Sequence, residues 1–505
     1  MNGSQPAKAV MVCGTTSSAG KSFLATALCR WYARRGLKVA PYKSQNMSNN
    51  ARVVAGGGMG SAQYFQALAA RAVPEVRMNP ILLKPERDDH SQVILLGQRH
   101  DELSRMAWRG RSEHLWPTAR DALHALMAEN EVVVIEGAGS PAEINLHGSD
   151  IANMRVAREA DAAVLLVSDI DRGGSFAHLY GTHQLLPAPE RALIRGFVLN
   201  KFRGDARLLA PGPEMLQSLT GVPIVGVLPL VRQHGLPEED GVFDAAPTGG
   251  APGEHQSIVV VAYPRISNLD EFQPLNAVPS VRLRWARDPK TVDGADLLIL
   301  PGSKHVAEDL RWLEASGMAA AIRRHVLADK PLLAICGGLQ MLGYELLDPH
   351  GVEGGGTGLG LLPLVTQYDA DKIQRRACHT LRGVTGHWSA LDGVCFESYE
   401  IRHGRSSLQA SAAPAPVAVL PDGAGWQLGN TLALYTHGLF ENTGVMHALF
   451  GAHTPSLDSC FHAYPVSSQW EILSPTVWGS APCCRARRRL SAPSRLRSRA
   501  GSGRQ

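Results

Sequence analysis

A cysteine and a histidine in the second half of the chain have the setting of a nucleophile and its base. Cys336 follows the apolar run PLLAI and opens the sequence Cys-Gly-Gly-Leu-Gln-Met-Leu-Gly. A strand that turns sharply into a helix exposes a side chain above a sheet, and the helix N-terminus favours a thiolate. His437 follows another apolar run, in Leu-Tyr-Thr-His-Gly-Leu-Phe. We therefore predict that Cys336 is a nucleophile and that His437 is its general base.

Two loops near these residues are candidates for an oxyanion hole. The backbone N–H of Gly337 directly follows the nucleophile, and Gly302 lies in the loop Pro-Gly-Ser after the apolar residues 297–300. Such donors stabilise the charge that develops in acyl transfer. Taken singly, a cysteine at a strand end is more often buried and inert, and a loop histidine is more often structural. The combination of Cys-Gly-Gly with a strand-following His-Gly is more specific and favours hydrolysis of an amide such as glutamine.

The start of the chain carries a phosphate-binding turn between an apolar run and a helical stretch. Strict P-loop spacing would need glycine at the position of Thr15, and the glycine lies one residue earlier. Gly20 lets backbone N–H groups close around phosphate oxygens, Lys21 supplies a positive charge, and Ser22 offers a hydroxyl to Mg²⁺. Gly/Ser-rich turns also occur without a nucleotide, but Gly-Lys-Ser at a helix start favours one. The predicted nucleotide-binding residues are Gly14, Thr15, Gly20, Lys21 and Ser22.

Acidic residues at strand ends are candidates for holding the magnesium ion of MgATP. Glu136 ends the apolar run VVVI and precedes Gly-Ala-Gly-Ser. In an open α/β sheet, ligands bind at the carboxyl ends of the strands, which is where Glu136 and the P-loop would meet. We predict that Ser22 and Glu136 hold the metal. Asp169 and Asp171 follow the run AVLLV and are weaker candidates, since each is also a plausible capping acid.

Three basic residues in loops after strands are candidates for binding substrate carboxylates. They are Arg172, Lys201 and Arg203. The alternative is that they are solvated loop charges, and the sequence does not separate the two interpretations.

The elements that must position these residues alternate between short apolar runs and stretches with helical spacing, which is typical of buried parallel strands in an α/β protein. Residues 22–35 are one such helix. The Pro-, Gly- and acid-rich residues 236–256 predict a linker. We therefore expect a first domain over residues 1–235, a second over 257–452, and an Arg-rich disordered tail over 453–505. The predicted strands are residues 9–13, 132–135, 163–167, 196–200, 258–262, 297–300 and 332–335.

Composition narrows the class of protein. The chain has 505 residues and a net charge of +4, but residues 481–505 hold eight Arg and no acid, so the preceding residues sum to −4. A mildly acidic body does not indicate nucleic-acid binding. No apolar run approaches the roughly 20 residues that cross a bilayer. Eight scattered cysteines without C-x-x-C spacing favour a reducing, cytoplasmic compartment and no structural zinc.

The two constellations, in this order, resemble the cobyric acid synthase family, the glutamine-hydrolysing enzymes of cobalamin biosynthesis. The resemblance runs from about residue 10 to 450. The matching stretches are GTTSSAGKS, PYKSQNMSNN, MNPILLKP with SQVILLGQ, IEGAGSPAEINL, SDIDRGGSFAHLYGT, VLNKFRGD, YPRISNLDEFQPL, LPGSKHVAEDL, AICGGLQMLG and YTHGLFEN.

This resemblance implies a fold and an activity. It implies a P-loop, dethiobiotin-synthetase-like parallel-sheet domain followed by a flavodoxin-like class I glutamine amidotransferase domain, both α/β. The family amidates the b, d, e and g side-chain carboxylates of adenosylcobyrinic acid a,c-diamide. The implied partners are the corrinoid, ATP and L-glutamine, with Mg²⁺ accompanying ATP, no permanently bound cofactor, no nucleic acid and no membrane. The sequence gives no oligomeric state.

The sequence also departs from the family's pattern. Class I glutaminases carry Glu two residues after the histidine, where this chain has Leu439, so we expect a Cys–His dyad with Glu441 as a weak substitute. The segments GGGMGSAQ (56–63) and LHGSD (146–150) are less charged than expected, and the Arg-rich end resembles a replaced terminus.

Three alternatives remain at this stage. One is cobyrinic acid a,c-diamide synthase, which shares both domains. The second is a P-loop partitioning or regulatory ATPase, which would have no use for Cys336 and His437. The third is a ligase inactivated by its altered terminus.

Overall fold

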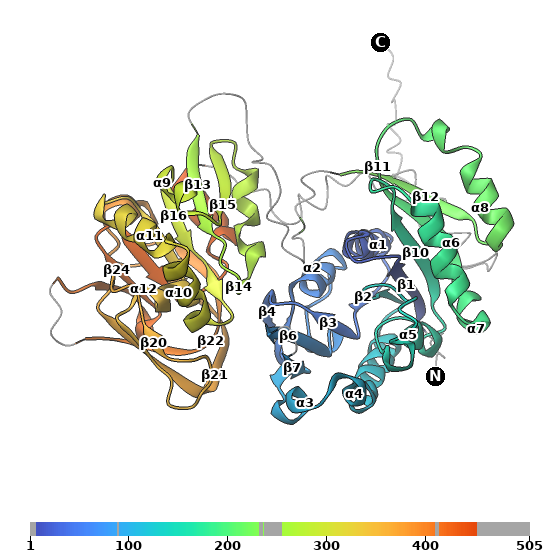
Figure 1. Cartoon of the computed structure of the whole chain (residues 1–505), viewed down its shortest axis with the longest axis horizontal. Coiled ribbons are helices and arrows are strands. Elements are labelled where there is room, and N and C mark those ends of the chain that lie inside the picture. The colour runs from blue at the N-terminus through green and yellow to red at the C-terminus, as the bar shows by residue number, and fades with distance from the viewer. Residues whose placement is uncertain (1–6, 88–89, 232–235, 237–254, 410–413, 452–505) are drawn as a thin grey trace, which may run out of the picture.

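Two α/β lobes lie side by side in the computed structural model (Figure 1). The structure describes residues 7–87, 90–231, 236, 255–409 and 414–451. The predicted linker over 236–256 lies mostly outside the described residues, and the predicted tail over 453–505 lies wholly outside them.

The first lobe is built on a six-stranded sheet in which all neighbouring strands are parallel. Its order is β12 (Ile224–Pro229), β11 (Ile194–Phe202), β10 (Ala163–Asp169), β1 (Lys8–Gly14), β9 (Val132–Glu136) and β2 (Val39–Tyr42). The strands predicted at 9–13, 132–135, 163–167 and 196–200 are confirmed. Their continuous apolar runs are explained by helices on both faces, which leave no solvated side.

Alternate residues of β1 contribute to two different cores. Val10 and Val12 pack with side chains of α1 (Lys21–Arg34) and α2 (Ser61–Ala69) on one face. Met11 and Cys13 pack on the other face, against a second set of helices. The helices that contribute to this second core include α3 (Asp101–Arg105), α4 (Trp108–Glu129), α5 (Met154–Glu159), α6 (Ser175–Leu185) and α8 (Gly212–Thr220), and α7 (Ala188–Arg191) completes the lobe.

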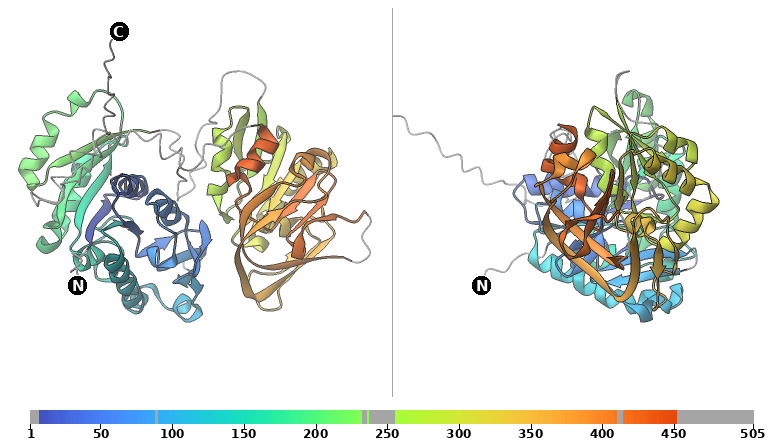
Figure 2. Two further views of the ribbon diagram at one scale, coloured as in Figure 1. Left: turned by 180° about the vertical axis from the view of Figure 1, so that it is seen from behind. Right: turned by 90° about the vertical axis from the view of Figure 1, so that its left-hand side faces the viewer.

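Two small sheets extend the first lobe toward the second, and sequence patterns did not predict either. One is the hairpin of β4 (Ala51–Val54) and β5 (Gly57–Gly60). The other has the order β3 (Gln45–Met47), β6 (Ile81–Arg87), β7 (His90–Leu95) and β8 (Gln98–Arg99). Figure 1 labels β4 and β6 in the part of the first lobe that faces the second, and Figure 2 shows the two lobes from behind and from the side.

The second lobe has a seven-stranded sheet with a parallel centre and an antiparallel edge. The strands predicted at 258–262, 297–300 and 332–335 are confirmed as β13, β16 and β18. The sheet order is β15 (Val281–Ala286), β13 (Gln256–Val261), β16 (Leu297–Leu300), β18 (Leu332–Ile335), β25 (Thr431–Leu434), β24 (Gly425–Leu428) and β23 (Val417–Leu420). The α-helices are α9 (Pro289–Asp293), α10 (Val306–Ala315), α11 (Met318–Leu327), α12 (Gly337–Leu342) and α13 (Thr443–Phe450).

A long antiparallel pair of strands lies where the second lobe contacts the first. Strands β21 (Leu364–Thr380) and β22 (Cys395–Leu408) pair along most of their length, joined by β19 (Glu345–Leu347) and β20 (Gly356–Thr357). Both long strands contact β4 of the first lobe. A further short pair, β14 (Ile266–Ser267) with β17 (Gly302–Ser303), lies beside the main sheet.

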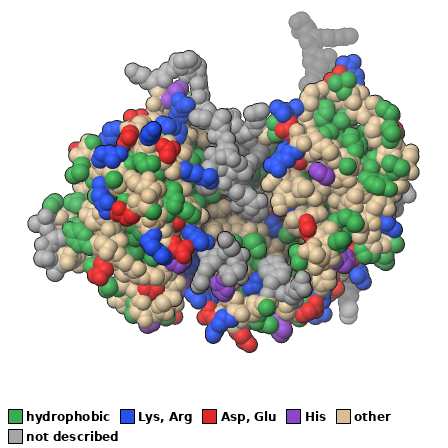
Figure 3. Space-filling model, in the orientation of Figure 1, with side chains coloured by type: hydrophobic (Ala, Val, Ile, Leu, Met, Phe, Trp, Pro, Cys, Tyr) green, Lys and Arg blue, Asp and Glu red, His purple; other side chains and the backbone are tan. Residues whose placement is uncertain are grey.

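The charges on the surface and the length and polarity of the helices agree with what the composition predicts. On the face drawn in Figure 3, basic side chains of the described residues are interspersed with acidic ones. In the part of the chain that the structure describes, every helix is too short or too polar to span a bilayer.

Candidate active site

The cysteine lies on the predicted sharp turn between a strand and a helix. Cys336 follows the central strand β18 and precedes α12, and its backbone has φ 50° and ψ −104°. A non-glycine residue at positive φ is strained, and such strain is a feature of nucleophile turns. The Cys336 N–H donates to the Leu434 carbonyl at 2.7 Å, which ties the turn to the neighbouring strand β25. The side chain is buried, with 6% of the residue exposed.

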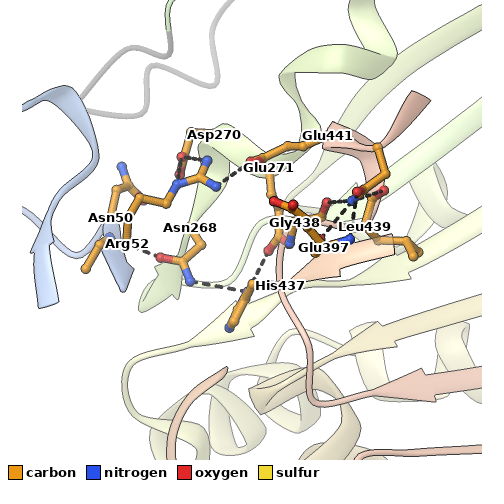
Figure 4. A network of polar contacts seen from close by, with 12 residues as sticks. Asn50, Arg52, Asn268, Asp270, Glu271, Glu397, His437, Gly438, Leu439 and Glu441 are labelled. Atoms are coloured by element: carbon orange, nitrogen blue, oxygen red, sulfur yellow. Dashed lines mark hydrogen bonds and ion pairs between the residues drawn. The ribbon is translucent and has the colours of Figure 1, made fainter. Parts of the chain in front are cut away.

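His437 is joined to a carboxylate that sequence reasoning missed. Glu271 lies in the helical segment Leu269–Ala277, and its Oε1 is 2.9 Å from His437 Nδ1. Its Oε2 accepts a hydrogen bond from the Gly438 N–H at 3.0 Å. Both Glu271 and His437 are almost fully buried. The result is a Cys–His–Glu arrangement in which Glu271 orients the imidazole. Figure 4 draws the contact between Glu271 and His437.

The charge of His437 follows from its neighbours. Burial alone would lower the pKa of His437, since it penalises the imidazolium. Glu271 and Cys336, by their negative charges and by hydrogen bonds to the ring, more than offset burial and raise the pKa of His437 to about 10. His437 is therefore protonated at neutral pH. The ring also stacks on Tyr399, with centroids 5.2 Å apart and planes 20° from parallel.

The predicted oxyanion residues surround the same point. A Cβ added to Gly337 would come within 2.6 Å of the Ser303 nitrogen, and one on Gly302 would come within 2.9 Å of His437 Cε1. The loop after β16 therefore lies directly against both Cys336 and His437. The structure brings Gly302 and Gly337 to the nucleophile, and their oxyanion role stays a prediction.

The expectation of a dyad with Glu441 as a weak substitute needs correction. Leu439 is buried and apolar, and Glu441 forms an ion pair with Arg52 at 2.5 Å. The carboxylate bonded to His437 is Glu271, which precedes the histidine by far in the sequence. A short-range search after the histidine could not find it. The available signal was the acidic pair inside the family-like stretch YPRISNLDEFQPL.

The first lobe reaches this site through β4. Arg52 is buried, and its Nε lies 2.9 Å from Asp270 Oδ2, one residue before Glu271. The Ala51 N–H donates to Asn268 Oδ1 at 3.2 Å, and Asn268 Nδ2 lies 3.2 Å from His437 Nδ1. Figure 4 shows this chain of contacts running from the first lobe to the histidine. The glutaminase residues are thus fixed by both lobes.

The phosphate-binding turn is formed as predicted around the start of α1. Gly20 has φ 98° and is the N-cap of α1, and a Cβ there would lie 2.0 Å from Asn200 Nδ2. Lys21 Nζ donates to the Thr16 carbonyl at 3.1 Å, so the side chain folds back over the turn. The Thr15 N–H is bonded to the Val167 carbonyl at 2.9 Å. Gly14 closes the loop, since a Cβ there would meet Thr16 O at 2.8 Å.

Glu136 and Ser22 meet at the carboxyl edge of the first sheet. Ser22 Oγ donates to Glu136 Oε1 at 2.9 Å. Lys43 Nζ lies 2.9 Å from the same oxygen, and Gln66 Nε2 donates to the other. Burial would raise the pKa of Glu136, but Lys43, together with hydrogen bonds from Gln66 and Ser22, holds it below its ordinary value. A buried, ionised carboxylate beside a hydroxyl is an all-oxygen pair that suits Mg²⁺ with nucleotide phosphates.

Lys43 is a second residue that sequence reasoning did not single out. It directly follows β2, so it lies at the same sheet edge as the P-loop and Glu136. The signal was present in the stretch PYKSQNMSNN, where the lysine follows an apolar strand.

The other predicted residues of the first lobe cluster around two aspartates. Lys201 Nζ lies 3.1 Å from Asp169 Oδ2 and donates to the Ser18 carbonyl at 2.9 Å. Arg172 Nε is 3.7 Å from Asp169, and Arg203 Nε is 2.7 Å from Asp171 Oδ1. Asp169 and Asp171 therefore face basic side chains, whereas the carboxylate that contacts Ser22 is that of Glu136. The role of the three basic residues in substrate binding stays a prediction, with Lys201 placed at the phosphate loop itself.

Comparisons with known proteins agree with the two-lobe division. Residues 10–239 match the CobQ/CobB/MinD/ParA nucleotide binding domain, and residues 257–445 match the CobB/CobQ-like glutamine amidotransferase domain. The first model alone covers partitioning ATPases as well as amidating enzymes. Curated relatives decide between them.

Cobyric acid synthases match nearly the whole chain. The protein from Methylibium petroleiphilum is 62% identical over 91% of this chain and 94% of its own length. Those from Variovorax paradoxus and Polaromonas naphthalenivorans are 62% and 63% identical, each over 90% of this chain and 95% of their own. The chain belongs to the cobyric acid synthase family.

Family membership confirms the predicted fold class and the general activity. Cobyric acid synthases join a P-loop nucleotide-binding domain to a glutamine amidotransferase domain, and both are present here in that order. The chain is thus an amidating enzyme of cobalamin biosynthesis. The regulatory ATPase and a,c-diamide synthase alternatives are not supported.

Proposed function

We propose that this protein uses ATP and L-glutamine to amidate the b, d, e and g side-chain carboxylates of adenosylcobyrinic acid a,c-diamide, giving adenosylcobyric acid. The observation that carries the proposal is the presence, in one chain, of a formed P-loop with Glu136 and of a Cys336–His437–Glu271 arrangement. One site suits activation of a carboxylate, and the other suits release of ammonia.

The glutaminase half-reaction follows from the charges at the second site. The Cys336 thiolate attacks the side-chain amide carbon of glutamine, and the N–H groups near Gly302 and Gly337 would stabilise the resulting oxyanion. His437, held as an imidazolium by Glu271, gives its proton to the leaving nitrogen, so ammonia departs as a neutral molecule. Water then hydrolyses the thioester to glutamate, with His437 now acting as the base.

The synthetase half-reaction would take place at the P-loop. A carboxylate is a poor electrophile at neutral pH, so ATP would phosphorylate it and phosphate would become the leaving group. The turn residues Gly20 and Lys21 would hold the transferred phosphate, while Ser22 and Glu136 would hold Mg²⁺. When bound, Mg²⁺ neutralises charge on the phosphate oxygens. Ammonia from the second lobe would then displace phosphate to give the amide.

Mass spectrometry of the corrinoid tests this proposal. The protein is incubated with ATP, Mg²⁺, glutamine and adenosylcobyrinic acid a,c-diamide, and each amidation changes the mass by the difference between OH and NH₂. We expect a ladder of mono- to tetra-amidated products that leaves the remaining propionate untouched. Because one activation geometry must serve carboxylates at different positions, intermediates should dissociate and accumulate. Robust glutaminase activity with no corrinoid turnover would contradict the substrate assignment.

A further inference from the structure

A group of lysines from both lobes lies beside the glutaminase site. Lys84 lies on β6, where its cross-strand partner on β7 is Gln92. Lys304 directly follows the loop of Gly302, and its Nζ is 3.4 Å from Gln92 Oε1. Lys372 lies on β21, at the irregular stretch of its pairing with β22. We call these three lysines the interlobe lysine cluster.

The cluster is electrostatically unfavourable as it stands. Lys84 is buried, with 5% of the residue exposed, and burial with repulsion from Lys372 and Lys304 lowers its pKa well below the ordinary value. Burial and Lys304 likewise lower the pKa of Lys372 to about 7. The nearby His403 is affected in the same way, since burial, Lys372 and Lys304 lower its pKa to about 4.

Among the described residues, these lysines have no carboxylate partner for the charge that they carry when protonated. Among the residues that the structure describes, no carboxylate lies within ion-pair distance of Lys84, Lys304 or Lys372. Glu353 acts on Lys372 at longer range and partly offsets the effect of burial. Buried charges are usually paired because an unpaired one is costly. The cluster therefore provides a place where an anion would bind and be held by several charge-assisted hydrogen bonds.

The position of the cluster indicates which anion. Lys304 places the cluster beside the turn that carries Cys336, because it follows the loop of Gly302 and Ser303. Ser303, the residue before Lys304, lies against the turn of Gly337. These lysines come from both lobes, and among the described residues they have no carboxylate partner. We therefore propose that Lys84, Lys304 and Lys372 form a carboxylate-binding site that spans the two lobes. This site would position substrate next to Cys336.

Two reactants of the proposed function bring such a carboxylate. Glutamine carries its α-carboxylate at the end of a short aliphatic chain from the amide that Cys336 attacks, which makes it the better fit to a cluster beside the nucleophile. The corrinoid carries several side-chain carboxylates, and Lys84 comes from the lobe that would activate them. The inference rests on the proposed two-site function, but its glutamine arm needs only the glutaminase half.

Substitution of Lys84 and Lys372 by methionine separates these sources. If the carboxylate is that of glutamine, Lys372→Met and Lys84→Met should each raise the KM for glutamine about tenfold or more, measured as glutamate release, because each variant loses a hydrogen bond to a charged group. Ammonium-driven amidation would keep its KM for the corrinoid. A corrinoid carboxylate predicts the opposite pattern, in which the corrinoid KM rises with either nitrogen donor and the glutamine KM is unchanged.

A thermal measurement tests binding without turnover. L-glutamate, which carries the same α-carboxylate, should raise the Tm of the wild-type protein and should raise that of Lys372→Met much less. Without ligand, each variant should melt at the wild-type temperature or above, because a repelling charge has been removed. The exposed Lys290→Met serves as the matched control and should behave as wild type throughout.

Three results would overturn the proposal. One is unchanged KM for both glutamine and the corrinoid in all three single variants, Lys84→Met, Lys304→Met and Lys372→Met. A second is a rise in the KM for ATP alone, which would assign the cluster to phosphate. A third is a fall of Tm in the ligand-free variants with no change in either KM, which would make the lysines structural. None of these results depends on which corrinoid carboxylates react, so the proposed function would stand or fall separately.

Discussion

At the scale of single residues, the chemistry of the second lobe depends on one buried hydrogen bond. Glu271 contacts His437 at 2.9 Å and also accepts from the next backbone N–H. It therefore fixes the orientation of the ring and its charge together. In the proposed mechanism, the acid His437 is therefore already protonated before glutamine binds.

Glu271→Gln is expected to change the pH dependence of the glutaminase. The amide keeps the size of the side chain but removes the charge that raises the pKa of His437 to about 10, so that pKa falls. His437 then loses its proton at lower pH, and the alkaline limb of kcat/KM for glutamine moves to lower pH. The rate should fall by roughly 10²-fold or more, as for the loss of proper acid–base function. Unchanged limbs in Glu271→Gln, with the exposed Glu314→Gln as control, would remove Glu271 from this role.

At the first site, Lys43→Met is expected to impair synthesis from either nitrogen donor. Lys43 is the leading cause that holds the pKa of Glu136 down against burial. Without it that pKa rises, Glu136 takes up a proton at higher pH, and the acid limb of ammonium-driven amidation moves to higher pH. The measurement is the pH profile of corrinoid amidation with saturating ammonium. The exposed Lys38→Met should keep the wild-type profile, and the same profile in Lys43→Met would contradict the account.

The sequence singled out candidate residues whose proposed chemistry has a local signature. Cys336 and Ser22 are flanked by the glycines and strand ends that such chemistry requires, so pattern sufficed. Glu271 and Lys43 carry no such local mark. Each becomes functional only because the fold brings it to a residue distant in sequence, His437 in one case and Glu136 in the other.

At the scale of elements, the turn between β18 and α12 depends on close approach. A Cβ on Gly338 would lie 2.2 Å from the Leu300 carbonyl oxygen, which belongs to the neighbouring strand. The Leu300 carbonyl is part of the sheet backbone, so it cannot move aside as the end of a flexible side chain can. The position of Cys336 is thus set by how tightly α12 packs on β16.

Gly338→Ala is expected to lower the free energy of unfolding by about 1–3 kcal/mol, the usual cost of overpacking. Glutamine-driven amidation should fall further than ammonium-driven amidation, because the displaced turn carries Cys336. Denaturant unfolding and the two activities are the measurements. In contrast, Gly181→Ala in α6, where a Cβ would meet nothing within 4 Å, should be neutral or stabilising. Equal behaviour of the two variants would contradict the packing argument.

Elements were predictable where burial on both faces left a continuous apolar run. That condition holds for the central strands β1, β10, β16 and β18. It fails for β21, which is half-buried and polar along much of its length, and for the short strand β4, which is buried but contains Arg52. These strands are stabilised by contacts between the lobes. The residue pattern of one strand cannot predict such contacts.

At the scale of the whole molecule, the two lobes share the network around the histidine. Arg52 of the first lobe is placed between Asp270 and Glu441 of the second, and it lies 5.2 Å from the centroid of the Tyr399 ring that stacks on His437. Docking of the lobes therefore bears directly on the glutaminase residues. Such a contact would link ammonia release to the state of the first lobe.

Arg52→Met is expected to uncouple the lobes. Removing one partner leaves Asp270 and Glu441 without their cation, which for a buried pair costs about 3–5 kcal/mol. Glutamine-driven amidation should fall strongly while ammonium-driven amidation is largely kept. The comparison is with Arg207→Met, which removes an exposed pair with Asp205 and should leave stability and both activities close to wild type. Equal losses with both nitrogen donors in Arg52→Met would argue against a coupling role.

The most direct test of the two-site account is the nitrogen-donor dependence of Cys336→Ala, with corrinoid amidation followed by mass spectrometry at saturating ATP. The account predicts that amidation from glutamine disappears while amidation from high ammonium continues near the wild-type rate, because only the source of ammonia is lost. The exposed Cys395→Ala should retain both activities. If a folded Cys336→Ala protein lost ammonium-driven amidation as well, or kept amidation from glutamine, the division of labour between the lobes would be contradicted.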